Sequence, residues 1–285
     1  ALAGVKGYEK FDAHIGTTGG RPTGRLADRI RKDLGTFEGF VVALRATARE
    51  GDQFTLVAPE RRTGRVGKVL FEQVVFPRLA SGYDVAHVPY WAMPARPRAP
   101  TVLTVHDLIP LVLDEYRGDW RVRGYVALVA RTTRSAAAVL VDSQYTASDV
   151  LAHLDVPSER VHHVPLGVSP IFRPARAHDG ADPRDAIERL MMRQRYGLPE
   201  RYGLYLGGFD PRKNLSTLIA AWRSVHAATG LPLVVAGEPR FGSLLPWETA
   251  DRTAVRVGLP SEAIVPIGAV MRDDLPALYR SATVF

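Results

Sequence analysis

Residues 205–215 (YLGGFDPRKNL) combine cations, glycines and a helix start in a way that suits the binding of a diphosphate. An apolar run ends at Gly207 and Gly208, which let the backbone turn sharply. Residues 214–225 then show the 3.6-residue apolar spacing of a helix, with Asn214 in the position of its N-terminal cap. The N-terminus of a helix offers unpaired N–H groups and a positive dipole end to an anion.

Two cations stand at this turn. Arg212 offers a planar fork of donors and Lys213 a compact point charge, and both suit phosphate oxygens. The same pattern also fits an ordinary strand-turn-helix corner with two solvated cations.

Other residues able to do chemistry also follow apolar runs that we interpret as strands. In an open parallel sheet, ligands bind beyond the carboxyl ends of the strands, so we expect these residues to border one cleft. The strand ends are followed by His87, His106 with Asp107, Ser143, Gly167, Gly237 with Glu238, and Gly268.

Strands and helices must alternate along the chain to place these residues at neighbouring strand ends. Short apolar runs alternate with longer helical patterns, which is typical of β-α-β units that feed a parallel sheet. We predict strands at residues 53–58, 85–88, 101–105, 138–141, 160–164, 202–206, 231–235 and 263–267. A proline-containing linker, residues 165–198, separates two series of strands and ends in a short helix at residues 184–196. The sequence therefore predicts an N-terminal domain, 1–172, and a C-terminal domain, 173–285.

Composition excludes several classes of protein. With 285 residues, 46% hydrophobic and 24% charged, the chain is expected to be a globular protein of two domains rather than a disordered one. It has no cysteine, no apolar stretch long enough to cross a bilayer and no signal-peptide pattern, so the cytoplasm is the expected compartment. The net charge of +7 is spread along helices, which argues against nucleic acid as a partner. Arg61, Arg62 and Arg65 near Lys68 leave a peripheral membrane contact open.

Several motifs in register resemble glycosyltransferase family 4. They are TVLTVHDLIP at residues 101–110, VLVDS at 139–143, VPLGV at 164–168, GGFDPRKN at 207–214 and LPALYRSA at 275–282, together with Glu72-Gln73 and His87. The resemblance implies the GT-B architecture, in which two Rossmann-like domains face a cleft. It also implies retaining transfer of a sugar from a nucleoside-diphosphate sugar to an acceptor hydroxyl.

The same resemblance assigns roles by matching position. Lys213 and Arg212 would bind the donor diphosphate, and His106 would face the donor sugar. The segment that reads the nucleobase through its backbone would contain Ile267, Gly268 and Val270. The remaining donor-binding positions would be Gly207 with Gly208 in the phosphate loop and Gly19 with Gly20 in a glycine-rich loop after the first strand.

The chain departs from the family pattern at two places. Gly208 stands where the family usually has an arginine, so Arg212 is expected to replace it. The Glu-x7-Glu motif that contacts the donor in the family does not occur before Phe285, so the C-terminal domain is expected to be incomplete.

Each candidate also has a structural interpretation. His106 is either a sugar-binding imidazole or a hydrogen-bonded structural histidine, and Asp107 is expected to bond its own following backbone. Glu238 either lines the nucleotide pocket or belongs to a loop. We expect no metal site, because the chain has no Asp-x-Asp pair and the alternation of a strand points His162 and His163 to opposite faces.

The sequence thus predicts a metal-independent, retaining hexosyltransferase without a cofactor. GDP-mannose is the donor that family frequency favours, and the acceptor is a glycan, a lipid-linked sugar or a small molecule. The alternatives are a nucleotide-sugar epimerase of the same fold and a non-catalytic nucleotide-sugar-binding module.

Overall fold

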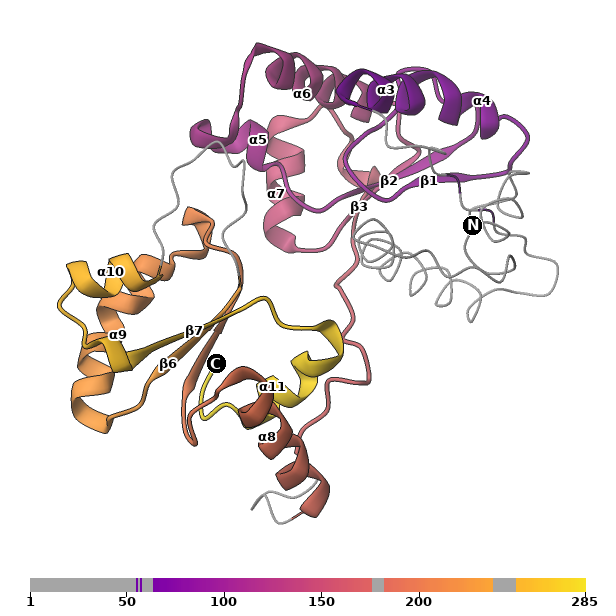
Figure 1. Cartoon of the computed structure of the whole chain (residues 1–285). Helices are drawn as coiled ribbons and strands as arrows, with labels where there is room; N and C mark the ends of the chain where they lie inside the picture. The colour runs from indigo at the N-terminus through magenta and orange to yellow at the C-terminus, as the bar shows by residue number, and fades with distance from the viewer. Residues whose placement is uncertain (1–54, 56, 58–63, 176–181, 238–249) are drawn as a thin grey trace. The chain divides into compact units, whose positions relative to one another are not determined.

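The structure, a computed structural model, describes Thr55, Val57 and residues 64–175, 182–237 and 250–285 (Figure 1). The chain divides into two compact units, unit 1 at Ala1–Leu166 and unit 2 at Gly167–Phe285. Each unit contains one parallel sheet with helices packed on it, so the chain has the predicted α/β fold with two parallel-sheet units.

The sheet of unit 1 has four parallel strands in sequential order: β1 (Ala86–Val88), β2 (Thr101–Val105), β3 (Ala138–Val141) and β4 (Val161–His163). Leu103 and Val105 of β2 and Val139 and Val141 of β3 are almost completely buried. They form the centre of an apolar core because the two central strands are covered by helices.

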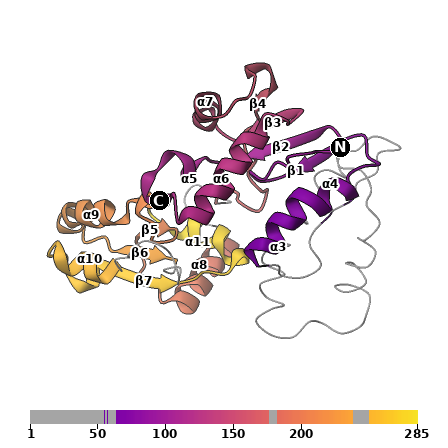
Figure 2. The ribbon, with the colours of Figure 1, turned by 90° about the horizontal axis from the view of Figure 1, so that it is seen from above.

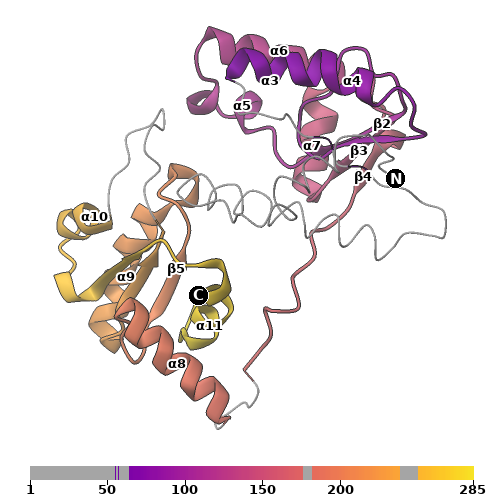
Figure 3. The same ribbon diagram turned by 45° about the vertical axis from the view of Figure 1, so that its right-hand side comes forward.

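The helices of unit 1 begin with α3 (Arg65–Leu70), which continues through a π-helical turn, η2 (Phe71–Val75), into α4 (Phe76–Leu79). This rod lies beside α6 (Trp120–Thr133), as Figures 1 and 3 show. Two shorter helical segments, α5 (Ile109–Val112) and η3 (Asp114–Tyr116), precede α6, whereas α7 (Gln144–His153) contacts β3 and β4 and is followed by η4 (Ser158–Arg160).

Side chains fix where two of these helices begin. Asp119 accepts hydrogen bonds from the backbone N–H groups of Arg121 and Val122 at the start of α6. Ser143 is the N-terminal cap of α7, because its hydroxyl oxygen accepts a hydrogen bond from the backbone N–H group of Thr146. None of the helices in the described ranges is both long enough and apolar enough to cross a bilayer.

The sheet of unit 2 has three parallel strands: β5 (Gly203–Leu206), β6 (Leu233–Ala236) and β7 (Ile264–Gly268). Val284 lies along the free edge of β5, where its carbonyl oxygen accepts a 2.8 Å hydrogen bond from the N–H group of Leu204. The central strand, β6, is buried along its whole length.

Helices cover both faces of this sheet (Figures 1 and 2). On one face α9 (Leu215–Thr229) and α10 (Ala250–Arg256) pack around Leu233 and Val235. On the other face α8 (Pro183–Tyr196) and α11 (Leu275–Ser281) pack around Val234 and Ala236. Successive residues of β6 therefore belong to two different cores, as the pleat of a strand requires.

The predicted strands agree well with the observed ones. The limits of β2 and β3 are as predicted, and the other five described strands differ from their predicted ranges by one or two residues at an end. Of the predicted strand at residues 53–58 only Thr55 and Val57 lie within the described residues. The contact-based division of the chain falls between Leu166 and Gly167, whereas the sequence placed the domain boundary after residue 172.

Candidate active site

In unit 1, His106 directly follows β2 and is bound at both ring nitrogens. Its Nδ1 lies 3.1 Å from Oδ2 of Asp142, and its Nε2 lies 3.2 Å from the carbonyl oxygen of Pro89. Pro89 follows β1 and Asp142 follows β3, so three neighbouring strand ends meet at this imidazole. The side chain of His106 is 50% exposed, which leaves the ring accessible to a ligand.

The backbone of His106 is also fixed. Thr146, in the first turn of α7, donates its hydroxyl to the carbonyl oxygen of His106 at 3.0 Å. The Asp107 carboxylate accepts a 3.1 Å hydrogen bond from the N–H group of Ile109, which confirms its expected role in the turn. The ring of His106 thus stands on a backbone that two neighbouring elements hold in place.

A second histidine, His87, lies on β1, the strand that pairs with β2. Nε2 of His87, on β1, is 2.8 Å from the hydroxyl oxygen of Thr104 on β2. Burial lowers the pKa of His87 to about 4, and the nearby charge of His106 acts in the same direction. His87 is therefore neutral in the folded protein at pH 7.

This lowered pKa predicts a pH-dependent stability. The unfolded chain takes up a proton at His87 near pH 6.5, so the stabilisation is complete above that pH and is lost as the pH falls from about 6.5 to about 4. We expect His87→Gln to reduce the difference in unfolding free energy between pH 7 and pH 4.5 by about 2 kcal/mol. Urea denaturation of both proteins at the two pH values measures this difference, and an equal pH dependence in both would contradict the prediction.

A buried carboxylate organises the segment that carries Pro89. Glu72 of η2 is 3% exposed and accepts hydrogen bonds of 2.9 Å from the hydroxyl groups of Tyr90 and Tyr125. Nζ of Lys68 lies 3.6 Å from Oε1 of Glu72 and within 5.5 Å of both tyrosine ring centroids. Burial and the Glu72 charge raise the pKa of both tyrosines, so each hydroxyl remains a donor.

The next residue of η2 binds the backbone of the same loop. Gln73 donates its Nε2 to the carbonyl oxygen of Met93 at 3.2 Å and accepts a 2.8 Å hydrogen bond from the N–H group of Ala95. The sequence pointed to Glu72-Gln73 only through the family resemblance. Here the pair fixes the loop after β1, whose first residue, Pro89, contacts His106.

In unit 2, glycines at the ends of the strands connect the predicted donor-binding segments. The N–H group of Gly207 donates to the carbonyl oxygen of Ala236 at 3.0 Å, and that of Gly237 donates to Gly268 at 2.8 Å. Gly237 has φ 137°, a conformation that side chains disfavour, and Gly268 has φ 68°. The carboxyl ends of β5, β6 and β7 are therefore tied together through backbone groups.

Gly237 leaves no room for a side chain. A Cβ atom there would lie 1.9 Å from the carbonyl oxygen of Gly207, which is backbone and cannot rotate away. We expect Gly237→Ala to lower the unfolding free energy by about 3 kcal/mol, from backbone strain and overpacking together. Gly208→Ala is the matched control, because a Cβ at Gly208 meets no atom within 4 Å. Equal melting temperatures for the two variants would contradict this prediction.

A tyrosine of β5 holds the backbone of the predicted phosphate loop that follows this strand. The hydroxyl group of Tyr205 donates to the carbonyl oxygen of Gly208 at 2.8 Å. Burial raises the pKa of Tyr205, and the Asp210 carboxylate adds to the effect. Nothing in the sequence distinguishes this tyrosine from the other residues of the buried strand predicted at residues 202–206.

The two cations of this loop differ in their surroundings. Arg212 makes a paired contact with the Asp210 carboxylate, with Nε–Oδ1 and Nη2–Oδ2 distances of 3.1 and 2.8 Å. Lys213 is exposed, and within the described residues no carboxylate lies within ion-pair distance of its ammonium group. A diphosphate would therefore meet an uncompensated charge at Lys213 and would compete with Asp210 for Arg212.

The helix start beyond Lys213 is also open. Asn214 occupies the predicted N-cap position, but it has the left-handed conformation, φ 52° and ψ 36°, and its side chain makes no capping hydrogen bond. An N-cap side chain reaches the first turn from extended backbone, which Asn214 does not have. The N-terminus of α9, at Leu215, thus stays available to an anion.

The predicted nucleobase segment lies at the end of β7. The side chains of Ile267 and Val270 pack against the core formed with α8 and α11, whereas Gly268 is only partly buried. Tyr196 donates to Asp274 at 2.6 Å and accepts from the N–H group of Met271 at 3.2 Å. A helix of the second core thereby positions the backbone that follows β7.

Other predicted positions fall elsewhere. Gly19, Gly20 and Glu238 lie outside the described residues. His162 and His163 are both exposed on the edge strand β4, so neither is buried in the core of unit 1. Within the described ranges no group of three or more potential ligands is arranged to hold a metal ion.

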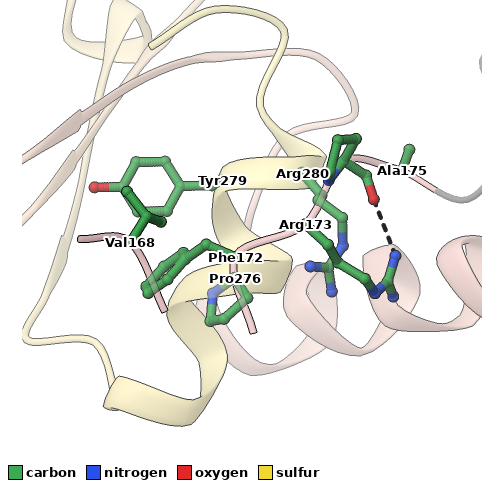
Figure 4. A pocket seen from close by; sticks show the side chains of 8 residues that line it. Val168, Phe172, Arg173, Ala175, Pro276, Tyr279 and Arg280 are labelled. Carbon is green, nitrogen blue, oxygen red and sulfur yellow. Dashed lines mark hydrogen bonds between the residues drawn. The ribbon is translucent and has the colours of Figure 1, made fainter. Parts of the chain in front are cut away.

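Unit 2 also contains a cavity of about 580 Å³ that none of the predicted site residues lines (Figure 4). Arg173 within it forms ion pairs with Asp185 and Glu188, and Arg280 pairs with Glu188, so acidic groups of α8 balance its cations. Its wall consists of Val168, Phe172, Arg173, Pro174, Ala175, Pro276, Tyr279 and Arg280.

Comparison with known sequences identifies relatives. Residues 57–171 match Glycosyltransferase Family 4. The O-antigen chain mannosyltransferase B of Escherichia coli is 28% identical over 204 residues, which are 70% of this chain and 50% of that protein. The serotype-specific mannosyltransferase WbdA of E. coli is 31% identical over 189 residues, which are 65% of this chain and 22% of that protein. The chain spans half or less of the length of these two relatives.

Solved structures share the fold. HepE of Anabaena, in complex with UDP and glucose, superposes with a TM-score of 0.53 at 16% identity, over 85% of this chain and 62% of that one. WaaG, a glycosyltransferase involved in lipopolysaccharide biosynthesis, gives a TM-score of 0.53 at 18% identity, over 90% of this chain and 69% of that one. The chain therefore has the α/β fold of these glycosyltransferases.

Proposed function

We propose that the protein transfers a hexosyl group from a nucleoside-diphosphate sugar to an acceptor hydroxyl, because residues 57–171 match Glycosyltransferase Family 4. The two E. coli relatives are named mannosyltransferases, which supports mannose as the sugar and GDP-mannose as the donor. HepE binds UDP and glucose, which supports a donor of this general chemistry. The acceptor class, the cytoplasmic location and a peripheral membrane contact stay predictions.

The observation that carries this proposal is the environment of Lys213. Its ammonium group is exposed, adjoins the uncapped start of α9 and follows the loop that Gly207 and Tyr205 hold in place. Negative charge builds up on a leaving diphosphate in the transition state, so a fixed cation there stabilises that state more than the ground state. Arg212 would contribute once the diphosphate displaces part of its contact with Asp210.

The proposed reaction balances without a metal or cofactor. The bond between the sugar carbon C1 and the diphosphate oxygen breaks, and a bond between C1 and the acceptor oxygen forms on the same face, so the anomeric configuration is retained. The proton of the acceptor hydroxyl passes to the leaving diphosphate, which serves as the base. His106 would bind the donor sugar through its half-exposed ring.

The test is a transfer assay on the full-length protein. The protein is incubated with GDP-mannose or UDP-glucose and a set of acceptors that includes oligosaccharides and lipid-linked sugars. We expect release of nucleoside diphosphate that depends on the acceptor, and a product that NMR shows to keep the anomeric configuration of the donor. A thermal-shift screen with GDP and UDP first identifies the base, because a ligand of the folded state raises the melting temperature.

The assay distinguishes the proposal from other chemistry. Conversion of the donor without any acceptor would indicate an epimerase. Binding of the donor by calorimetry without turnover on any acceptor would indicate a binding module. A product with inverted configuration would keep the transferase but overturn the retaining mechanism.

A further inference from the structure

Asp142 has one partner among the described residues, and that partner is the ring of His106. Its carboxylate does not cap α7, since the neighbouring Ser143 does so. It also forms no ion pair with an arginine or lysine of the described ranges. Its side chain is 18% exposed, against 50% for His106, so the carboxylate lies behind a ring that is open to solvent. Any effect of this largely buried carboxylate must therefore pass through its contact with His106.

Both nitrogens of the His106 ring face oxygen acceptors of the protein. A carboxylate oxygen accepts hydrogen bonds and holds a proton on the nearer nitrogen, here Nδ1 at 3.1 Å. The other nitrogen, Nε2, lies 3.2 Å from the carbonyl oxygen of Pro89, which is also an acceptor. Two contacts on opposite sides of the ring fix its plane, as a residue that must hold a sugar in one orientation requires.

We propose that Asp142 is a positioning residue for sugar transfer: it accepts the Nδ1 proton of His106, keeps that nitrogen protonated and fixes the plane of the ring that binds the donor sugar. This inference rests on the proposed function. Asp142 does not contact the substrate, and its effect on the rate passes entirely through His106.

A double-mutant cycle tests this dependence. We expect Asp142→Ala to lower kcat by about 10- to 100-fold in the wild-type background, with the KM for the donor changed less than about threefold. In the His106→Ala background the same substitution is expected to change kcat by less than about twofold. Equal losses in both backgrounds would overturn the proposal, because a purely structural carboxylate would act independently of the ring.

The matched control is Asp107→Asn. Asp107 is an acidic residue at the same strand end, but it binds the backbone of Ile109 rather than the ring, and asparagine can keep that hydrogen bond. We expect this variant to keep kcat within about threefold of the wild type. If Asp142→Ala does not fold, Asp142→Leu replaces it in the cycle, because leucine has a similar shape and accepts no hydrogen bond.

Nitrogen-15 NMR of the histidine rings provides a readout that is independent of turnover. The His106 signals are identified by their loss in His106→Ala. We expect Nδ1 to carry a proton in the wild-type protein. In Asp142→Ala we expect the neutral ring to carry its proton on Nε2, because the carbonyl oxygen of Pro89 is then its remaining acceptor. An Nδ1 that stays protonated in that variant would overturn the inference. If the wild-type protein transfers no sugar to any acceptor, the proposed function fails, while the NMR result still decides whether Asp142 positions the ring.

Discussion

Replacing Lys213 by alanine is expected to lower the rate of sugar transfer by about 100- to 1000-fold, the range found when one preorganised charge-stabilising group is removed. Lys213 is exposed and contributes nothing to either core of unit 2, so the melting temperature should change little. The loss should appear mainly in kcat, because the charge on the leaving diphosphate is larger in the transition state than in the bound donor. Steady-state kinetics of the full-length protein measures it.

The control for this experiment is Arg223→Ala. Arg223 is also an exposed cation and lies on α9, the helix that Lys213 precedes, but it stands two turns further along. We expect its removal to leave kcat within about twofold, because the interaction of an exposed charge is screened over that distance. If both variants lose activity equally, the effect comes from the general positive charge of the protein, and the specific role of Lys213 is refuted.

Removing the buried carboxylate of Glu72 should strongly destabilise unit 1. Glu72→Ala leaves two tyrosine hydroxyl groups without their acceptor and the ammonium group of Lys68 without its anion. Breaking a buried charged network by deleting one partner costs about 3–5 kcal/mol. Glu72→Gln keeps the volume of the side chain, but its amide has one acceptor oxygen for the two tyrosine hydroxyl groups. We therefore expect a smaller loss of unfolding free energy, about 2 kcal/mol. Urea denaturation followed by intrinsic fluorescence gives both values.

Glu115→Ala is the comparison that separates burial from charge. Glu115 is an exposed acidic residue of the same unit, and its removal should change the unfolding free energy by less than about 0.5 kcal/mol. A loss below about 1 kcal/mol for Glu72→Ala would mean that the tyrosines find other partners, and the cluster would then not hold the loop of Pro89 in place.

The strands were predictable because each is a short apolar run bounded by residues that end it. The limits of β2 and β3 were predicted from the apolar runs TVLTV and AVLV, and in the structure every second residue of these strands is buried. The start of α9 was predicted correctly, but the backbone conformation of its N-cap residue was not. Asparagine favours both the capping position and the left-handed backbone conformation, and only the structure shows that Asn214 adopts the second without capping the helix.

The sequence predicts which candidate residues stand at the strand ends. It does not predict which residues they contact. Asp142 stands 36 residues after His106, and Tyr125 stands 53 residues after Glu72. No local pattern connects such positions, because the pairing depends on the order of strands in the sheet and on the placement of helices across it. The contact of Arg212 with Asp210 is local, yet it was not predicted, because an arginine at such a turn can bind either a phosphate or a nearby carboxylate.

The central strand of unit 2, β6, links the two helix layers that pack on opposite faces of the sheet. Leu233 and Val235 of β6 are buried under one layer of helices, and Val234 and Ala236 under the other. If either layer detaches, one side of the same four residues is exposed to water, which weakens the strand that the opposite layer needs. Unit 2 should therefore open as one cooperative body, and the backbone ties among Gly207, Gly237 and Gly268 should persist until it does.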